Sequence, residues 1–449
     1  MSEILIHTKK GIIRGEGKNG YSVFKGIPFA KPPVGKLRWK APVPVEPWGG
    51  VLDATEFAPI CPQGVPAPPN PYFNEFYSDK KYQREMSEDC LYLNIWAPEN
   101  AEGKKLPVAF YIHGGGFGGG YSSEIEFDGE AFCKEDVILV TIAYRVGVFG
   151  FLALPQLDAE NENHISGNYG MLDQIEALNW VYENIESFGG DPENITVFGQ
   201  SAGCMSTQIL ISSQLTEGKI AKAIFMSGLT CDDEFLFTPT LKEEEECCKE
   251  MLEELCDLSV AELRELNEEI LLKKHEAFNM KMMKKAFEEG SAGGLLIVPN
   301  VDGHLLKKNV RETFAANEFH KIPYMVGCVL EDLGTTDDDR KNNVPGLLLE
   351  QAKKWALKQE EATGIPSYVY SFDYILPGDE KPTWHSLELW YVMGTYGRSW
   401  RPMTEADAAL SREAVKCWTN FMKTGNPESA ETEEWKPYTN NNRFVRHFV

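Results

Sequence analysis

A serine between two glycines is the first pattern in this chain that could do covalent chemistry. Ser201 stands in Gly199-Gln-Ser-Ala-Gly203, directly after the β-branched and aromatic run 195–198. That run predicts a buried strand, and residues 202–210 predict a helix. A serine on so sharp a turn has an exposed hydroxyl beside free backbone N–H groups. The pattern predicts a nucleophilic serine, although so short a motif also occurs by chance.

A glycine run could stabilise the negative charge that such a nucleophile creates on a carbonyl oxygen. His113-Gly-Gly-Gly-Phe117 follows the apolar run 106–112, which predicts a strand buried on both faces. This position is the carboxyl end of a strand, where ligands bind in open α/β sheets, and it argues against a merely flexible loop. We expect the N–H groups of Gly115, Gly116 and Ala202 to form an oxyanion hole.

Five histidines follow Ser201, and one of them is well placed to act as a general base. With a nucleophile turn of this kind, the chain order is serine, acid, histidine. His385 lies in a loop after the last predicted strand, at the sheet's edge, from which it could reach the serine. The others lie in an acidic helical stretch, after an Asp-Gly turn, before a strand and two residues from the C-terminus: His275, His304, His320 and His447.

Two adjacent carboxylates could orient the histidine. Glu331 and Asp332 follow the predicted strand 324–327 and precede His385. The acid of such a site holds the imidazole in place and stabilises its charged form, without itself accepting a proton. The residue types do not choose between the two.

Alternating strands and helices position these groups. Buried strands that alternate with helices predict an α/β fold with a mainly parallel central sheet and helices on both faces. The expected strands are 91–97, 106–112, 137–143, 195–198, 223–226, 324–327 and 368–372, and residues 171–185 form an expected helix with one apolar face.

Three further regions complete one predicted domain over residues 1–449. Residues 1 to about 30 predict a small β-meander, followed by the Pro-rich extended loop 27–35. Residues about 235–295 predict a charged helical insertion that serves as a lid or a pocket wall. The Pro- and aromatic-rich stretch 60–86 predicts a long loop, either packed over the mouth of the site or simply exposed.

Composition excludes several function classes. The 449 residues are 43% hydrophobic and carry a formal net charge of −24. Such acidity argues against nucleic acid and against an anionic membrane surface as partners. We find no apolar run long enough to span a membrane, no signal peptide and no cysteine or histidine spacing for zinc. We therefore expect a cytoplasmic monomer with free thiols.

The motifs together resemble the type B carboxylesterases and cholinesterase-like proteins, in a compact form of the bacterial type, with the α/β-hydrolase fold. The resemblance covers most of the chain. It rests on these segments: Phe24-Lys-Gly-Ile-Pro-Phe-Ala30, Leu37-Arg-Trp39, Ser87-Glu-Asp-Cys-Leu-Tyr-Leu-Asn94, His113-Gly-Gly-Gly-Phe117, Tyr144-Arg145 with Gly147, Gly167-Asn-Tyr-Gly-Met-Leu-Asp-Gln174, Phe188-Gly-Gly-Asp-Pro192, Phe198-Gly-Gln-Ser-Ala-Gly203, Thr419-Asn-Phe421 and Gly425-Asn-Pro427.

The resemblance implies hydrolysis of small-molecule carboxylic esters through an acyl-serine, with no cofactor and no metal. It implies Ser201 as nucleophile and His385 as base. It favours Asp332 as the acid, with Glu331 as the alternative, because the family's usual glutamate lies five residues after the strand-end glycine. Gly115, Gly116 and Ala202 become the oxyanion donors, Ser227 and Glu388 support the site, and Cys61 and Cys90 match the family's first disulfide.

Some features of the family do not carry over. An aspartate is one methylene shorter than a glutamate, and Leu333 replaces the glycine that usually follows the acid. The interval from residue 331 to residue 385 is shorter than the family predicts, so substrate choice does not transfer. The same triad could act on a thioester, a lactone or an arylamide. A non-catalytic interaction protein would need a lost nucleophile or base, and both are present.

Overall fold

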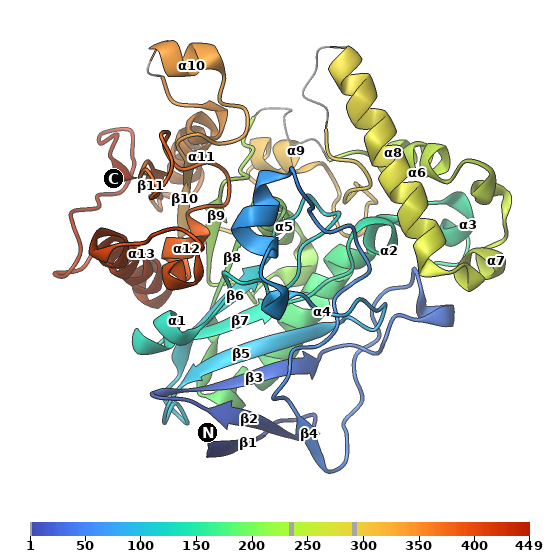
Figure 1. Cartoon of the computed structure of the whole chain (residues 1–449), viewed down its shortest axis with the longest axis horizontal. Helices are drawn as coiled ribbons and strands as arrows, with labels where there is room; N and C mark the ends of the chain where they lie inside the picture. The colour runs from blue at the N-terminus through green and yellow to red at the C-terminus, as the bar shows by residue number, and fades with distance from the viewer. Residues whose placement is uncertain (1, 233–237, 290–293, 343) are drawn as a thin grey trace.

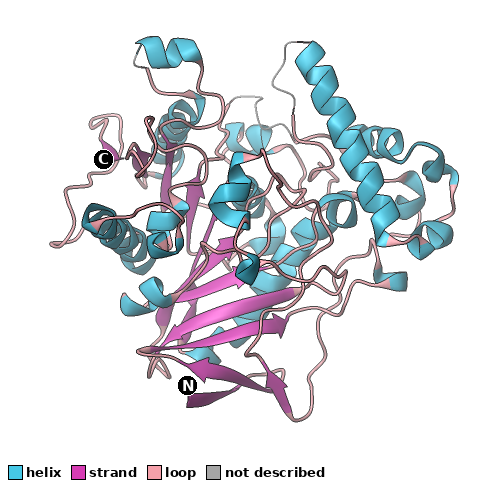
Figure 2. Ribbon diagram, viewed as in Figure 1, coloured by secondary structure: helices cyan, strands magenta, loops and turns pink. Residues whose placement is uncertain are grey.

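One central sheet brings the predicted strands together (Figures 1 and 2). A computed structural model describes residues 2–232, 238–289, 294–342 and 344–449. The strands are β1 (Ser2–His7), β2 (Ile12–Gly17), β3 (Tyr21–Pro28), β4 (Val51–Asp53), β5 (Tyr92–Pro98), β6 (Leu106–Ile112), β7 (Ile138–Ile142), β8 (Gly190–Gln200), β9 (Lys222–Met226), β10 (Tyr324–Val329), β11 (Tyr368–Phe372) and β12 (Val445–Phe448).

The sheet changes character along its width. Its order is β1-β2-β3-β5-β7-β6-β8-β9-β10-β11-β12, and β4 pairs with β2. The pairs from β1 to β7 are antiparallel, except that β4 runs parallel to β2. All pairs from β7 to β12 are parallel. The expectation of a mainly parallel sheet is confirmed for the half that carries the nucleophile turn.

Helices cover both faces of this sheet (Figure 2). They are α1 (Glu130–Lys134), α2 (Gly147–Phe151), α3 (Pro155–Asp158), α4 (Tyr169–Asn184), α5 (Ala202–Ser212), α6 (Leu241–Leu252), α7 (Val260–Glu265), α8 (Glu268–Glu288), α9 (Val310–Ala315), α10 (Asp337–Asn342), α11 (Leu347–Thr363), α12 (Leu389–Val392) and α13 (Glu405–Thr424). No helix of the described residues is long and apolar enough to cross a membrane.

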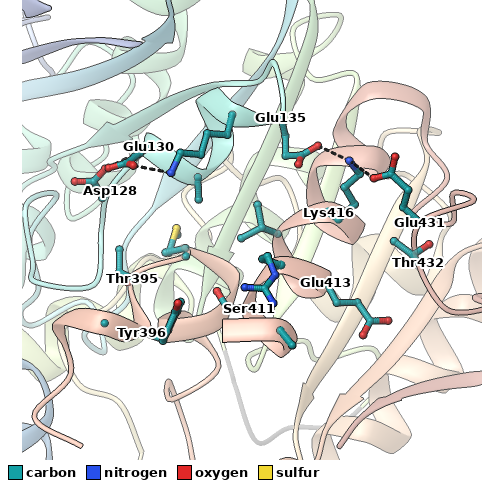
Figure 3. A pocket seen from close by; sticks show the side chains of 18 of the residues that line it. Asp128, Glu130, Glu135, Thr395, Tyr396, Ser411, Glu413, Lys416, Glu431 and Thr432 are labelled. Carbon is teal, nitrogen blue, oxygen red and sulfur yellow. Dashed lines mark hydrogen bonds and ion pairs between the residues drawn. The ribbon is translucent and has the colours of Figure 1, made fainter. Parts of the chain in front are cut away.

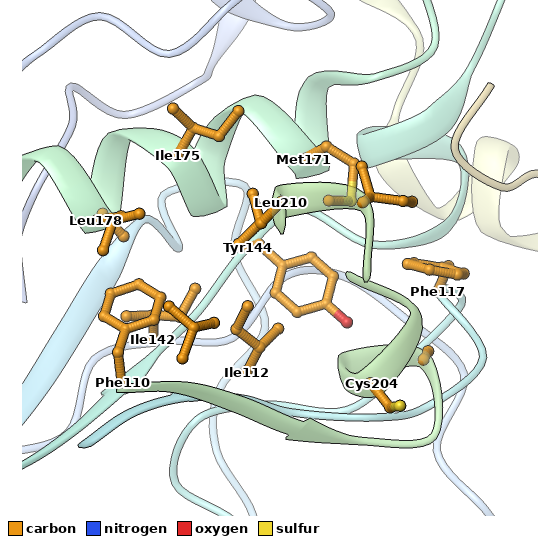
Figure 4. Packing of buried hydrophobic residues seen from close by; sticks show 14 of the residues in the cluster. Phe110, Ile112, Phe117, Ile142, Tyr144, Met171, Ile175, Leu178, Cys204 and Leu210 are labelled. Carbon is orange, nitrogen blue, oxygen red and sulfur yellow. The ribbon is translucent and has the colours of Figure 1, made fainter. Parts of the chain in front are cut away.

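Alternating side chains of β6 enter two separate cores. Phe110 and Ile112 pack with α4, α5 and α11 on one face, and Tyr111 packs with α1, α12 and α13 on the other. Figure 4 shows Ile175 and Leu178 of α4 lying over the first face. Burial of apolar side chains on both faces holds β6 and β8 rigidly, and these are the strands from which the glycine run and the serine emerge.

The predicted helical insertion comprises α6, α7 and α8 within residues 238–289. These helices lie together at one side of the molecule, with α8 the long yellow helix of Figure 1. Thr240, Ser259 and Asn267 begin them, and each side chain accepts a backbone N–H of the first turn. The predicted edges at 235–237 and 290–293 lie outside the described residues.

The strand predictions fail at several ends. Ile27 and Pro28 belong to β3 and not to the predicted loop, and β8 begins at Gly190, five residues before the apolar run. The short edge strand β12 was not predicted, and His447 lies inside it instead of in a loose terminus. The first residues of β8 are mainly polar and half of β12 is polar, so pairing with a neighbouring strand, and not hydrophobicity alone, determines these two segments.

Candidate active site

The serine turn has the strained geometry that its sequence predicts. Ser201 adopts φ 58° and ψ −125° between β8 and α5, a conformation that non-glycine residues rarely adopt. Its N–H donates to Met226 O at 3.0 Å on the next strand. A Cβ on Gly203 would lie 2.0 Å from Ile112 O, so only glycine allows α5 to approach β6 this closely. The turn therefore holds the serine rigidly.

The glycine run lies directly against this turn. A Cβ on Gly114 would lie 3.2 Å from Ser201 Cβ. Gly115 and Gly116 have φ values of 105° and 62°, which direct the chain back on itself. Ala202 is the first residue of α5, so its N–H has no acceptor within the helix. The structure thus brings the predicted oxyanion donors and the serine to one place.

His385 contacts Asp332 and not Glu331. His385 Nδ1 lies 2.5 Å from Asp332 Oδ1, and both residues are buried. Asp332 also accepts backbone N–H bonds from Val329 and Leu333, at 3.2 and 2.8 Å. These donors fix its carboxylate against the imidazole.

The neighbouring Glu331 points elsewhere. Its carboxylate pairs with the Arg340 side chain on α10, while its backbone bridges to Trp384. Adjacent residues in an extended segment face opposite sides, and this explains why only one of the two carboxylates meets the histidine.

A buried carboxyl group lies near the His385–Asp332 pair and acts on it through its charge. Glu388 is fully buried, and Ser227 Oγ donates to its Oε1 at 3.0 Å. Burial, and then the charge of Asp332, raise the pKa of Glu388 to about 7. Burial alone would lower the pKa of His385, but the charge and hydrogen bond of Asp332, together with Glu388, outweigh it, so the pKa is raised.

Sequence reasoning missed the residue that contacts the other imidazole nitrogen. Gln200 Nε2 lies 3.3 Å from His385 Nε2, and Gln200 Oε1 accepts a hydrogen bond from Ser386 Oγ at 3.1 Å. Within the described part of the chain, no hydrogen bond joins Ser201 Oγ to His385. Gln200 stands next to the serine in the sequence, but only the approach of the 385–386 loop gives it a partner.

The loop 60–86 packs against the segment that carries the histidine. Tyr72 stands edge-on to Trp384, with ring centroids 5.1 Å apart, and its hydroxyl donates to His385 O at 3.4 Å. Deeper in the loop, Glu75 is buried against Arg401 at 3.0 Å and accepts a bond from Trp390 Nε1. This arrangement supports the packed alternative over a freely exposed loop.

The predicted helical insertion also reaches the glycine run. The buried His275 ring of α8 lies 2.8 Å from the place of a Cβ on Gly147 and 3.7 Å from that of a Cβ on Gly118, the residue after the glycine run. Burial lowers the pKa of His275 to about 4. Leu295, the last residue of the predicted insertion, lies 3.3 Å from the place of a Cβ on Gly116. These contacts put the insertion beside the predicted oxyanion hole.

A cavity of about 1020 Å³ lies away from this site, between α1, the segment after α12 and α13. Figure 3 shows its charged rim, where Lys416 pairs with Glu135 and Glu431. None of the predicted catalytic residues lines this cavity. Its large volume is therefore no reason to regard it as the active site. The predicted catalytic residues lie instead around the nucleophile turn.

The cysteines are thiols, and the described residues contain no group of His, Cys, Asp or Glu arranged for a metal. Cys61 and Cys90 are buried neighbours joined by a hydrogen bond, which raises the pKa of Cys90 first and burial second. The pairing that family resemblance implied is therefore a close contact of two free thiols.

Comparison with known proteins gives one consistent result. A model described as the carboxylesterase family matches residues 2–351 and 347–448. The para-nitrobenzyl esterase of Bacillus subtilis (strain 168) is 34% identical, over 98% of this chain and 93% of its own. The fumonisin B1 esterase of Sphingopyxis macrogoltabida is 31% identical, over 96% and 84%. A solved PNB esterase structure superposes with a TM-score of 0.84 at 30% identity, covering 100% of this chain and 96% of that chain.

Proposed function

We propose, since the chain belongs to the carboxylesterase family and has its α/β-hydrolase fold, that Ser201, His385 and Asp332 are the catalytic triad of a serine hydrolase that cleaves carboxylic esters. The 2.5 Å contact between His385 and Asp332, beside the strained Ser201 turn, is the observation that carries this assignment. The pairing of Glu331 with Arg340 argues against the alternative acid.

The reaction follows from these positions. Ser201 Oγ attacks the ester carbonyl while His385 Nε2 takes its proton, and Asp332 stabilises the imidazolium that forms. Backbone N–H groups of Gly115, Gly116 and Ala202 bind the oxyanion of the tetrahedral intermediate, and each is worth about 2.7–4 kcal/mol of barrier. His385 then protonates the leaving alcohol. Water, activated by the same imidazole, hydrolyses the acyl-serine.

Ser227 and Glu388 act through the histidine. With its pKa near 7, Glu388 stays largely protonated below neutral pH and so adds little negative charge beside Asp332. Its bond from Ser227 Oγ fixes its position. We assign both residues to holding the imidazole and the aspartate in register, and not to contact with substrate.

The substrate class is a small-molecule ester. The names of the relatives report a para-nitrobenzyl esterase and a fumonisin B1 esterase, and both names describe ester cleavage. We favour carboxylic esters over thioesters, lactones and arylamides on this ground. The natural acyl and alcohol groups depend on the side chains of the insertion and of loop 60–86.

The direct test is hydrolysis of p-nitrophenyl acetate by wild type, Ser201→Ala and Ser212→Ala. Loss of the nucleophile should lower kcat by on the order of 10⁶-fold. Ser212 lies at the far end of the same helix and bonds Gln208 O, so its variant should keep wild-type activity. Equal rates for wild type and Ser201→Ala would refute the assignment.

We also propose that residues 1–449 act as one catalytic domain, as a monomer in the cytoplasm, without a nucleic-acid or membrane partner. Ten free cysteines support a reducing compartment, and the net charge of −24 supports the absence of nucleic-acid binding. Analytical ultracentrifugation should give the mass of one 50.5 kDa chain. A mass of twice that value would contradict the monomer.

A further inference from the structure

Gln200 is placed to control the nitrogen of His385 that must act as the base. It is the last residue of β8, and it is 2% exposed. Its carboxamide joins the nucleophile strand to the histidine loop by two contacts, 3.3 Å from Nε2 to His385 Nε2 and 3.1 Å from Oε1 to Ser386 Oγ. No step of the triad mechanism above uses this side chain.

The other hydrogen bonds of His385 and Gln200 determine which of the two donates in their contact. Asp332 Oδ1 accepts from His385 Nδ1, so the imidazole hydrogen lies on Nδ1 and Nε2 carries the lone pair. Gln200 Oε1 accepts from Ser386 Oγ, so the amide nitrogen faces the imidazole and has only hydrogens to offer. The contact is therefore an amide N–H that donates to the basic nitrogen of neutral His385.

The neighbouring residues provide a space that accommodates the Gln200 carboxamide. A Cβ on Gly114 would lie 3.2 Å from Gln200 Oε1 and 2.9 Å from its backbone oxygen, so the absent side chain provides the room. Ser386 adopts φ 78°, a left-handed conformation in a non-glycine residue. Strain at the residue that holds the carboxamide indicates that the contact is built into the loop and is not incidental.

We propose that Gln200 is a positioning residue that holds His385 as the neutral, Nδ1-protonated tautomer and releases Nε2 to the Ser201 hydroxyl when an ester binds. This inference rests on the proposed triad. Because a hydrogen bond to the neutral imidazole disfavours its protonation, Gln200 opposes Asp332, which favours the charged form. The amide keeps the base free of a proton near neutral pH.

The acid limb of kcat/KM against pH reports this balance. Replacement by Gln200→Glu keeps the shape but puts a carboxylate, an acceptor of the protonated Nε2–H, beside the imidazole. The acid limb of this variant should move to higher pH by about 1 pH unit or more. Gln200→Met removes the N–H donor without adding charge, and the acid limb of this variant should move to higher pH by about half as much. The groups facing His385 are otherwise unchanged: Asp332, Glu388 and the Tyr72 hydroxyl from loop 60–86.

A matched control separates contact from general charge. Gln214→Glu adds the same charge at an exposed site, and its acid limb should coincide with that of wild type. Acid limbs of both Gln200 variants that coincide with wild type would overturn the proposal while leaving the triad intact. Failure of the triad itself would instead be seen as an active Ser201→Ala enzyme.

A second measurement needs no turnover. In the Ser201→Ala background, NMR titration gives the pKa of His385 directly, with and without Gln200→Met. The added substitution should raise that pKa, whereas equal values in the two proteins would overturn the proposal. This readout also serves if Gln200→Glu fails to fold.

Discussion

Of the two neighbouring carboxylates, only Asp332 is held in place to orient the histidine. Two backbone N–H groups and the His385 imidazole surround it, whereas Glu331 meets the guanidinium of Arg340 near the surface. The sequence narrowed the acid to these two residues but could not separate them, because composition does not tell which side of an extended segment faces inward.

Exchange of each carboxylate for its amide tests this difference. Asp332→Asn keeps the shape but lets the amide stabilise the wrong imidazole tautomer, so kcat should fall by about 10⁴-fold. Glu331→Gln serves as the matched control and should change kcat by less than about 10-fold. Steady-state hydrolysis of p-nitrophenyl acetate measures both. The acid is misassigned if only Glu331→Gln abolishes turnover.

The local backbone of single residues was predictable where a motif determines it. Ser201 and the glycine run carry their geometry in the sequence, because only glycines permit those turns. His385 needed chain order and topology in addition. The contact of Gln200 with His385 depends on two loops far apart in the sequence, and no local signal could have located it.

Elements buried on both faces were the easiest to predict. The bounds of β6 follow directly from its apolar run, because all its residues except Pro107 belong to one of the two cores. The first residues of β8 are mainly polar and half of the edge strand β12 is polar, so pairing with the neighbouring strand determines both. The loop 60–86 could be identified as a long loop, but its fixed packing arises from single tertiary contacts.

Glu75 is the anchor of that loop. Its buried carboxylate accepts bonds from the guanidinium of Arg401 and from the indoles of Trp390 and Trp400. Glu75→Gln leaves the buried Arg401 with only Asp379 as a charged partner, and we expect a loss of about 3 kcal/mol in the free energy of unfolding.

Urea denaturation at pH 7 measures this loss. Glu405→Gln removes the acid of the exposed ion pair with Arg412, and this control should cost less than about 1 kcal/mol. If the two substitutions destabilise the protein equally, Glu75 does not anchor the loop.

The whole molecule combines an acidic surface with buried acids. Glu244 of α6 is 2% exposed and accepts an N–H from Val298 at 3.2 Å, and burial raises its pKa to about 8. Between the ordinary pKa of 4.5 and this value, the folded chain holds a proton that the unfolded chain has lost. The contribution of Glu244 to stability therefore falls as the pH rises from about 4.5 to about 8.

Comparison of two pH values isolates this contribution. From pH 6.5 to pH 8, Glu244→Gln should gain on the order of 2 kcal/mol in unfolding free energy relative to wild type. Glu246→Gln, at an exposed position of the same helix, should show no such gain. Urea denaturation of the three proteins at both pH values gives the answer. A constant difference between Glu244→Gln and wild type would mean that Glu244 is already ionised at pH 6.5.

Substrate choice depends on segments from several parts of the molecule, and the sequence alone did not predict it. The insertion meets the glycine run through Leu295 and the adjoining Gly118 through His275, while loop 60–86 meets the histidine through Tyr72. Side chains from these two distant segments thus lie beside the glycine run and the segment of the histidine. Their identities follow no motif, so the family defines the reaction and the tertiary structure defines what enters.

Covalent trapping tests the central claim most directly. A p-nitrophenyl alkylphosphonate places a tetrahedral phosphorus centre where the ester carbonyl reacts, and it remains bonded to the attacking nucleophile. Mass spectrometry of the intact protein and of its peptides should find one adduct, on Ser201, with release of one p-nitrophenolate and none in Ser201→Ala. An adduct on another residue, or equal labelling of Ser201→Ala, would contradict the account.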